Sequence, residues 1–207
     1  HRVDRRQRQM CIRDRYSAFA ATPEGGNPAG VVLDAGGMTE ERMQQIAADV
    51  GFSETAFLVG RTDESGVPRY RARYFSPAAE VPFCGHATVA TAVALAERDG
   101  PGEVVFDTNA GAVTLRSVVD AHSGVTVSFT SVEPQVRDLD PDVLERLLGM
   151  LGLTGSDLDD RFPAREAFAG NWHPILVVDD RELFDQFRFS PDEVAALMRE
   201  NGWLGTI

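Results

Sequence analysis

The chain has no lysine, since all 20 of its basic residues are arginine. This absence excludes a Schiff-base lysine, hence pyridoxal-phosphate chemistry, and the lysine of a Walker-type phosphate loop. Cysteine is scarce as well: Cys11 and Cys84 lie far apart and form neither a C-x-x-C pair nor a disulfide framework. Such cysteine usage is typical of a reducing, cytoplasmic compartment. No apolar run is long enough to span a bilayer, so we expect no membrane partner.

Acidic residues exceed basic ones, and the formal net charge is −12 over 207 residues. Because phosphate binding requires a basic face, this charge argues against a nucleic-acid partner. The histidines, cysteines and carboxylates show no zinc-ligand spacing, and the sequence has no nucleophile elbow or dinucleotide-binding glycine pattern. Nothing in these patterns indicates a metal or a cofactor.

The first fifteen residues, 1–15, differ from the rest of the chain. They carry six arginines and two aspartates, a net charge of 6 − 2 = +4, which leaves −12 − 4 = −16 on residues 16–207. Such a basic block is compatible with a nucleic-acid arm or a targeting peptide, although it lacks the apolar segment of a secretory signal. We expect instead a non-native segment, in which case Cys11 has no functional meaning.

Residues 16–207 mix strand and helix signals, and a boundary between two domains is expected near Pro134. Strands are expected over 18–20, 30–33, 53–59, 70–75, 103–107, 112–119, 125–130 and 175–178. Helices are expected over 40–50, 87–98, 141–151, 181–187 and 191–200. The first is capped by Thr39 and Gly51, the third is opened by Asp140-Pro141, and the last is opened by a Ser190 capping box. Residues 62–68 and 157–171 have turn or loop composition, and a strand is expected to begin after Gly202. This order predicts an α+β fold, with antiparallel hairpins around one central helix.

The central helix is the most informative element. Its sequence, Ala87–Arg98 (ATVATAVALAER), is apolar on every side, and such a helix must be buried all round. Its first N–H groups then point out of the core. They would favour an anion such as a substrate carboxylate, by roughly 0.3–1 kcal/mol.

A thiol, a glycine and an imidazole, from Cys84, Gly85 and His86, stand where this helix begins. Taken singly, the cysteine is more simply a small core residue and the histidine a cap. Together, at the mouth of a fully apolar helix, they favour a functional site. The helix N-terminus is expected to lower the pKa of the Cys84 thiol, which would make it more reactive. It is also expected to lower the pKa of His86 and so favour the neutral imidazole.

Two further candidates lie upstream. Glu54 stands in FSETAF, and strand alternation would put it on one face with Phe52 and Ala56. That face either meets solvent or buries the carboxylate, and a buried carboxyl group is suited to proton transfer near neutral pH. Asn27 belongs to a turn signal and could also bind a substrate. His173 precedes an expected buried strand and could approach a cavity.

Three blocks, in order, give the chain a family likeness. They are Ala18-Phe19 with Gly26-Asn27-Pro28-Ala29-Gly30-Val31-Val32-Leu33, then Ser53-Glu54-Thr55-Ala56-Phe57, then Phe75-Ser76-Pro77 running to Cys84-Gly85-His86-Ala87-Thr88. In these residues the chain resembles the phenazine-biosynthesis-like (PhzF-type) isomerases, which are related by fold to diaminopimelate epimerase and proline racemase. The resemblance covers about residues 16–207. It implies two similar halves, each a curved sheet around a central helix, with the active site in the cleft between them.

The resemblance also implies a function. The expected activity is that of a cofactor-independent isomerase, which moves a proton between carbons of a small carboxylic acid. Glu54 would be the acid/base, and His86 would act with it in the catalytic site. The expected substrate-binding residues are Asn27, Cys84, Gly85 and Ala87. Homodimers are frequent among such proteins, although no residue of this chain indicates one.

Other functions remain open. Cys84 matches the position where the epimerases keep a catalytic thiol, so a two-base amino-acid racemase or epimerase is one alternative. A non-catalytic small-acid binding protein or an inactive fragment is another. Nothing in residues 134–207 matches the family's second central helix or its Glu-Asp-Pro-x-Thr-Gly-Ser-like opening. We therefore expect residues 16–133 to form a first half with its central helix at 86–98, and residues 134–207 an incomplete second half.

Overall fold

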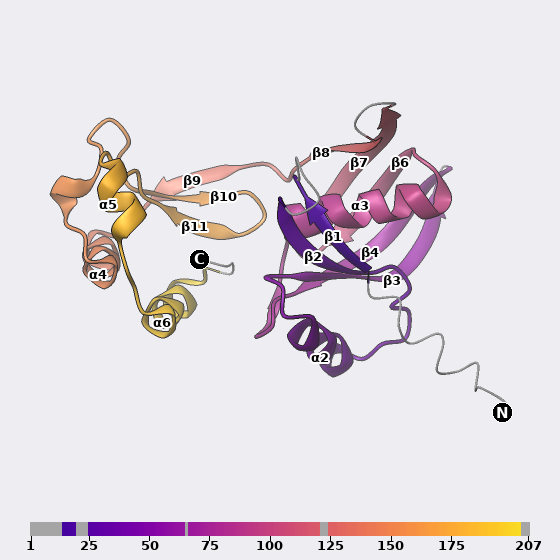
Figure 1. Ribbon diagram of the computed structural model, residues 1–207, viewed down its shortest axis with the longest axis horizontal. Coiled ribbons are helices and arrows are strands. Elements are labelled where there is room, and N and C mark those ends of the chain that lie inside the picture. The colour runs from indigo at the N-terminus through magenta and orange to yellow at the C-terminus, as the bar shows by residue number, and fades with distance from the viewer. Residues whose placement is uncertain (1–13, 20–24, 65, 121–123, 204–207) are drawn as a thin grey trace. The chain divides into compact units, whose positions relative to one another are not determined.

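The computed structural model describes residues 14–19, 25–64, 66–120 and 124–203. The chain divides into two compact units, His1–Val132 and Glu133–Ile207, each of which is described by itself (Figure 1). Cys11 lies outside the described residues, as does the strand expected to follow Gly202, except for its first residue, Trp203. No helix in the described ranges is long and apolar enough to cross a membrane.

The described residues of the first unit form one sheet and two helices. The strands are β1 (Asp14–Ala18), β2 (Asn27–Val32), β3 (Thr55–Glu64), β4 (Val67–Phe75), β5 (Glu80–Val81), β6 (Glu103–Thr108), β7 (Gly111–Asp120) and β8 (Gly124–Thr130); the helices are α2 (Glu40–Val50) and α3 (Gly85–Asp99). The strand order is β1-β2-β3-β4-β6-β7-β8, with β5 paired to β4. The β2–β3 and β4–β6 pairs are parallel and the others antiparallel, so the sheet is mixed.

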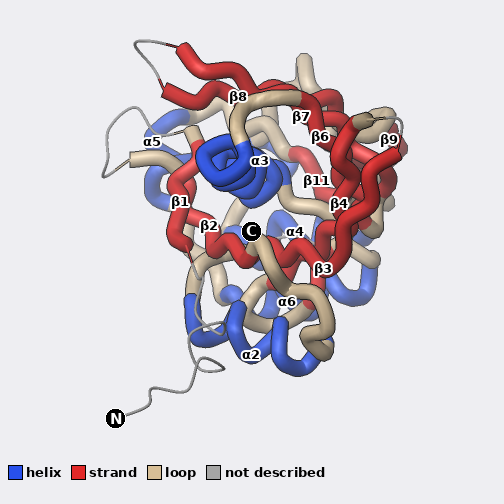
Figure 2. The backbone as a smooth tube through the Cα atoms, turned by 90° about the vertical axis from the view of Figure 1, so that its right-hand side faces the viewer, coloured by secondary structure: helices blue, strands red, loops and turns tan. Residues whose placement is uncertain are grey.

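The sheet curls around α3, as the view along this helix shows (Figure 2). Strands from both ends of the sheet order, β1 and β8, contact α3, as do β2, β3 and β7. None of the residues from Gly85 to Ala96 is exposed, which confirms the prediction of a helix buried all round. Alanines and threonines dominate this stretch, and such short side chains leave room for strands on every side.

Hydroxyl groups inside this core have partners. Thr91 Oγ1 donates to the Ala87 carbonyl oxygen at 2.7 Å, and the Tyr74 hydroxyl and Thr88 Oγ1 lie 2.7 Å apart. The second of these bonds joins β4 to the first turn of α3. Because a buried hydroxyl without a partner is costly, these bonds allow threonine in an otherwise apolar core.

The outer face of the sheet is covered near β3 and β4 by α2. This helix begins after Thr39, whose Oγ1 accepts from the Arg42 N–H at 3.3 Å, and it ends at Gly51 with φ of 71°. Both caps confirm the sequence prediction, because only a left-handed residue closes the helix here and glycine adopts that conformation without strain.

Some predicted boundaries in this unit were wrong. The turn expected over 62–68 is much shorter, since β3 runs to Glu64 and β4 starts at Val67. The strand expected from Ser53 begins at Thr55, so Glu54 precedes β3 and the alternation argument does not apply to it. The first strand ends at Ala18, and Phe19 takes a left-handed φ of 59°. Asp14 and Arg15 belong to β1, where they pair with Val31 and Gly30.

The second unit combines a small antiparallel sheet with three helices. Its elements are β9 (Gln135–Asp138), α4 (Pro141–Leu151), a 3₁₀ turn (Gly155–Asp157), β10 (Arg165–Phe168), β11 (Trp172–Ile175), α5 (Arg181–Gln186) and α6 (Pro191–Asn201). The strand order is β11-β10-β9. Its apolar core includes the fully buried Leu197 of α6 and Trp203, which follows that helix. The Trp203 indole N–H donates to Glu166 Oε2 at 2.9 Å.

Three expectations for this unit need correction. The segment 157–171 is not all loop, because it contains β10, which pairs with strands on both sides. The strand expected over 175–178 ends at Ile175, which is 47% exposed, and so it is not a buried strand. Ser190 precedes α6 but makes no side-chain capping bond, so the capping box is not formed. By contrast, Asp140 caps α4 as the sequence predicted, accepting from the Asp142 and Val143 N–H groups.

Candidate active site

Three titratable side chains of the first unit converge where α3 begins. Glu54 comes from the segment just before β3, and Cys84 and His86 flank the first residue of α3. One ligand-type atom from each of the three lies within 4.8 Å of the other two. The His86 Nε2 atom is 3.5 Å from Glu54 Oε2, and His86 Nδ1 is 3.2 Å from Cys84 Sγ. The imidazole therefore stands between a carboxylate and a thiol.

Local backbone geometry explains how this cluster forms. Cys84 is the N-cap of α3, with extended backbone dihedrals of −144° and 113°, and its carbonyl accepts the first helical bond from Thr88 at 3.0 Å. On the other side, the Gly30 N–H of β2 donates to the Glu54 carbonyl oxygen at 3.1 Å, which fixes the approach to β3. The β2–β3 pairing and the start of α3 thus bring Glu54 close to Cys84 and His86, which lie about 30 positions later in the chain.

The carboxylate of Glu54 is buried without full compensation. The residue is only 4% exposed, and its Oε2 atom has no hydrogen-bond partner, although a buried polar atom normally has one. The His86 Nε2 atom lies 3.5 Å from that oxygen, and the Cys84 thiol also interacts with the carboxylate. An under-satisfied buried carboxylate is costly to keep for stability alone, which marks Glu54 as a candidate for chemistry.

Burial shifts the pKa values of His86 and Cys84, the two ionisable neighbours of Glu54. Desolvation lowers the pKa of the His86 imidazole, which outweighs the opposite effects of the Glu54 charge and of a hydrogen bond to the Pro28 backbone. The ring is thereby kept neutral, as the sequence predicted. For Cys84 the prediction was wrong, because burial and then the Glu54 carboxylate raise the pKa of the thiol. The backbone N–H groups of Ala87 and His86 act in the opposite direction but are outweighed.

The same three side chains are also possible metal ligands. Carboxylate, thiol and imidazole can all bind zinc, and in the described part of the chain they are the one such group of three. His86 Nε2 lies near both partners, 3.5 Å from Glu54 Oε2 and 4.0 Å from Cys84 Sγ, although the thiol is nearer to Nδ1, at 3.2 Å. A metal would need the thiolate, whereas burial raises the pKa of the Cys84 thiol and favours its protonated form.

The other expected site residues lie nearby, with unequal access. Ala87 is wholly buried, so only its backbone N–H could reach a ligand. Gly85 opens α3, and a Cβ added there would meet Phe129 and Phe83 only at 3.9 and 4.0 Å, so packing does not require glycine. Asn27 is exposed at the start of β2, beside the Pro28 backbone that faces the His86 ring.

Sequence reasoning missed one residue of this cluster. The Ser53 hydroxyl lies 3.3 Å from His86 Nε2, so it shares that nitrogen with Glu54. The signal available in the sequence was its place directly before Glu54 in the second family-like block. A hydroxyl can both donate and accept, so Ser53 can satisfy Nε2 whether or not that atom carries the proton.

A family comparison bears on the whole of this arrangement. The family model described as "Phenazine biosynthesis-like protein" matches residues 16–207. The chain belongs to this phenazine biosynthesis-like family. An uncharacterized isomerase of Deinococcus radiodurans is 38% identical over 189 residues, which cover 90% of this chain and 60% of the relative.

Solved structures of the family and of an epimerase are similar to this chain. The phenazine biosynthesis protein of the PhzF family from Bacillus anthracis has a TM-score of 0.69 and 34% identity, covering 90% of this chain and 62% of that one. A predicted epimerase from Pseudomonas aeruginosa has a TM-score of 0.77 and 25% identity, covering 91% and 66%. These likenesses confirm the expected α+β, diaminopimelate epimerase-like fold. The chain spans about 60% of the length of the curated relatives it matches.

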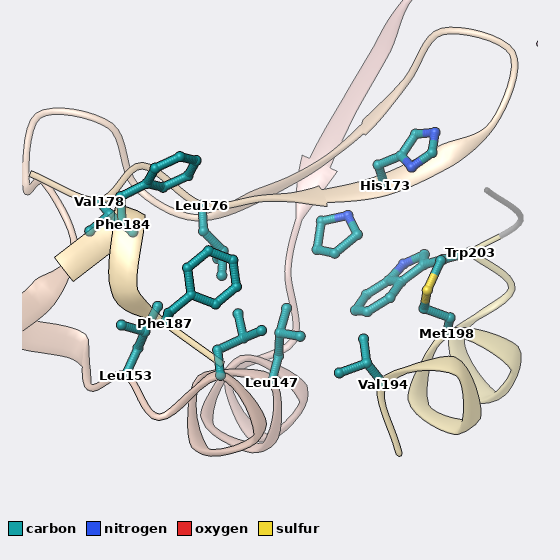
Figure 3. Close-up of a pocket in the computed structure, with 12 residues that line it drawn as sticks. Leu147, Leu153, His173, Leu176, Val178, Phe184, Phe187, Val194, Met198 and Trp203 are labelled. Carbon is teal, nitrogen blue, oxygen red and sulfur yellow. The ribbon is translucent and has the colours of Figure 1, made fainter. Parts of the chain in front are cut away.

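The second unit of this family member holds a different kind of hollow. A pocket of about 250 Å³ lies among α4, α5, α6 and β11, and Figure 3 shows its lining. The side chains are almost all aliphatic or aromatic, with His173 as the single titratable group. Burial lowers the pKa of His173, which is half-buried there. This lining offers no carboxylate or thiol, so the cluster of Glu54, Cys84 and His86 is the better candidate for acid/base chemistry.

Proposed function

We propose that this chain carries the acid/base site of an isomerase that moves a proton between carbons of a small carboxylic acid. Glu54 takes the proton from one carbon and returns it to another, and the neutral His86 orients the substrate and the carboxylate. The observation that supports this most directly is the buried Glu54 Oε2 atom, which has no hydrogen-bond partner and lies 3.5 Å from the imidazole.

The surroundings favour this role on physical grounds. Removing a proton next to a carboxylate group leaves negative charge, which must be stabilised by fixed dipoles in a site poor in water. The first N–H groups of α3, at Gly85, His86 and Ala87, supply such dipoles at the same place. The relatives named as isomerases agree with this class of reaction.

Solvent exchange tests the proposal. The full chain is incubated in deuterium oxide with a panel of free amino and hydroxy acids, and the loss of the substrate C–H signal is followed by proton NMR. Glu54→Gln should abolish the exchange: we expect its rate to fall at least roughly 100-fold, the factor that a positioned acid/base group contributes. Glu166→Gln is the matched control, since Glu166 is also buried but is paired with Arg137 and lies in the second unit.

The outcome also separates the alternatives. Exchange that survives Glu54→Gln but not Cys84→Ser would favour the two-base racemase with Cys84 as a base. Burial argues against that mechanism, because it raises the pKa of the thiol and makes the thiolate scarce. A ligand-induced rise in melting temperature without any exchange would favour a small-acid binding protein.

A further inference from the structure

The segment that carries Cys84 and His86 is held to the sheet by a very short strand. β5 has only two residues, Glu80 and Val81, and its ladder to β4 is limited to those two positions. The chain then runs through residues 82–84 into α3. So short a pair is marginal by itself, so the position of the site segment depends on side-chain contacts as well.

The side chain of Glu80 provides those contacts. Arg73 on β4 donates from Nε to Glu80 Oε1 at 2.7 Å and from Nη2 to Oε2 at 2.6 Å. Asn109, after β6, donates to the same Oε1 at 2.9 Å. The Arg73 and Glu80 side chains are 19% and 22% exposed, so the pair is largely shielded from water. A bidentate, charge-assisted pair of this kind fixes geometry more strongly than a single neutral hydrogen bond.

Arg73 is itself anchored from two other directions. Its guanidinium lies 5.1 Å from the centre of the Phe75 ring, and its Nη2 atom also donates to Glu40 of α2 at 2.8 Å. The guanidinium that binds Glu80 is therefore also held by contacts that do not involve Glu80. Glu80 connects the site segment to this fixed point four residues before Cys84.

We propose that Glu80 is a positioning residue, which holds β5 against the sheet and keeps Cys84 and His86 in place at the start of α3. Its effect on catalysis rests on the proposed function, but the positioning itself does not.

The chain offers a matched control for this proposal. Arg69 and Asp107 form a second bidentate pair, at 2.6 and 2.5 Å, between β4 and β6 of the same sheet. Their side chains are 33% and 35% exposed, and neither residue belongs to the segment 76–86. Asp107→Asn removes one charge from a pair of the same kind, as Glu80→Gln does.

Alkylation of Cys84 measures the opening of the segment. In a Cys11→Ser background Cys84 is the single thiol, and it is 8% exposed, so iodoacetamide reacts when the segment opens. Glu80→Gln should raise the native-state rate roughly tenfold, the factor expected for losing a hydrogen-bonded charge. Asp107→Asn should change it by less than about twofold. Amide hydrogen exchange should accelerate in residues 80–84 and not in β7.

Each other outcome overturns the proposal. An unchanged rate in Glu80→Gln would mean that Glu80 does not hold the segment, and equal rises in both variants would mean a general loss of stability rather than positioning. If Glu80→Gln does not fold, Asn109→Ala removes one bond to Glu80, and the absence of any rise in its alkylation rate is equally decisive. The alkylation assay uses no substrate. If the wild-type chain catalyses no proton exchange, the proposed function is overturned, but the alkylation result still decides whether Glu80 positions the segment.

Discussion

A single added methyl group at Gly30 tests how tightly the site is fixed from the side of β2. A Cβ built there would lie 2.5 Å from Thr55 Oγ1 and 2.8 Å from Thr55 Cγ2. Thr55 is fully buried and pairs with Gly30 in the parallel β2–β3 ladder. Because real Cβ atoms do not come so close to other atoms, either Thr55 or one strand must move in Gly30→Ala.

The expected cost follows from this overlap. Overpacking a well-packed core costs about 1–3 kcal/mol of unfolding free energy. With a urea m-value of about 2 kcal/mol per molar, a loss of about 2 kcal/mol lowers the unfolding midpoint by about 1 M. The Glu54 carbonyl accepts its bond from the same Gly30, so the displacement also reaches the candidate active site.

The two units can be followed separately in one protein. Both tryptophans, Trp172 and Trp203, belong to the second unit, whereas Cys84 belongs to the first. Pulse labelling of Cys84 in the Cys11→Ser background therefore reports the first unit, and tryptophan fluorescence reports the second. Gly30→Ala should lower the midpoint seen by labelling and leave the midpoint seen by fluorescence unchanged.

A compensating substitution provides the control. Thr55→Ala removes the two atoms that the new methyl group would meet most closely and leaves the Cβ of residue 55 at 3.1 Å, and Thr55 Oγ1 has no hydrogen-bond partner to lose. The double variant should therefore be more stable than the sum of the two single effects predicts, with a coupling of about 1 kcal/mol or more. An unchanged labelling midpoint in Gly30→Ala, or simple additivity in the double variant, would refute the reasoning.

The two titratable neighbours of Glu54 give further expectations. Since burial lowers the pKa of folded His86, its neutral form contributes stability that is present above the unfolded value of about 6.5 and is lost as the pH falls through the folded pKa. Urea midpoints between about pH 8 and about pH 5 should thus fall less steeply in His86→Gln, and equal slopes would contradict this. Since burial raises the pKa of Cys84, iodoacetamide should react with the native thiol at least about tenfold more slowly than in urea, whereas similar rates would mean an exposed thiol.

Local sequence signals predicted those elements whose causes are themselves local. The all-apolar pattern of α3 predicted its burial, since no arrangement other than enclosure satisfies a helix without a polar face. Thr39 and Gly51 predicted both ends of α2, and Asp140 the start of α4, because caps act within one helical turn. The antiparallel β6–β7–β8 meander followed in the same way from short turns between alternating runs.

Signals failed where pairing or burial decides. β10 lies in a loop-like sequence, yet it has partners on both sides, the next strand β11 across a short turn and β9, which is distant along the chain. The apolar run 175–178 predicted a buried strand, but β11 ends at Ile175, which is exposed. Ser190 has the right residue type for a capping box without making the bond. In each case the outcome depends on which neighbours the tertiary structure supplies.

The same division holds for the candidate active site. The sequence alone determined that a thiol and an imidazole stand at the first turn of a buried helix, because one-turn geometry and apolar patterning suffice for that. Only the tertiary structure decided that Glu54 meets His86 at 3.5 Å, through the β2–β3 ladder and the entry into α3. It also reversed the expected pKa shift of Cys84, because the helix N-terminus is a short-range, modest effect, while desolvation and a nearby carboxylate depend on everything packed around the thiol.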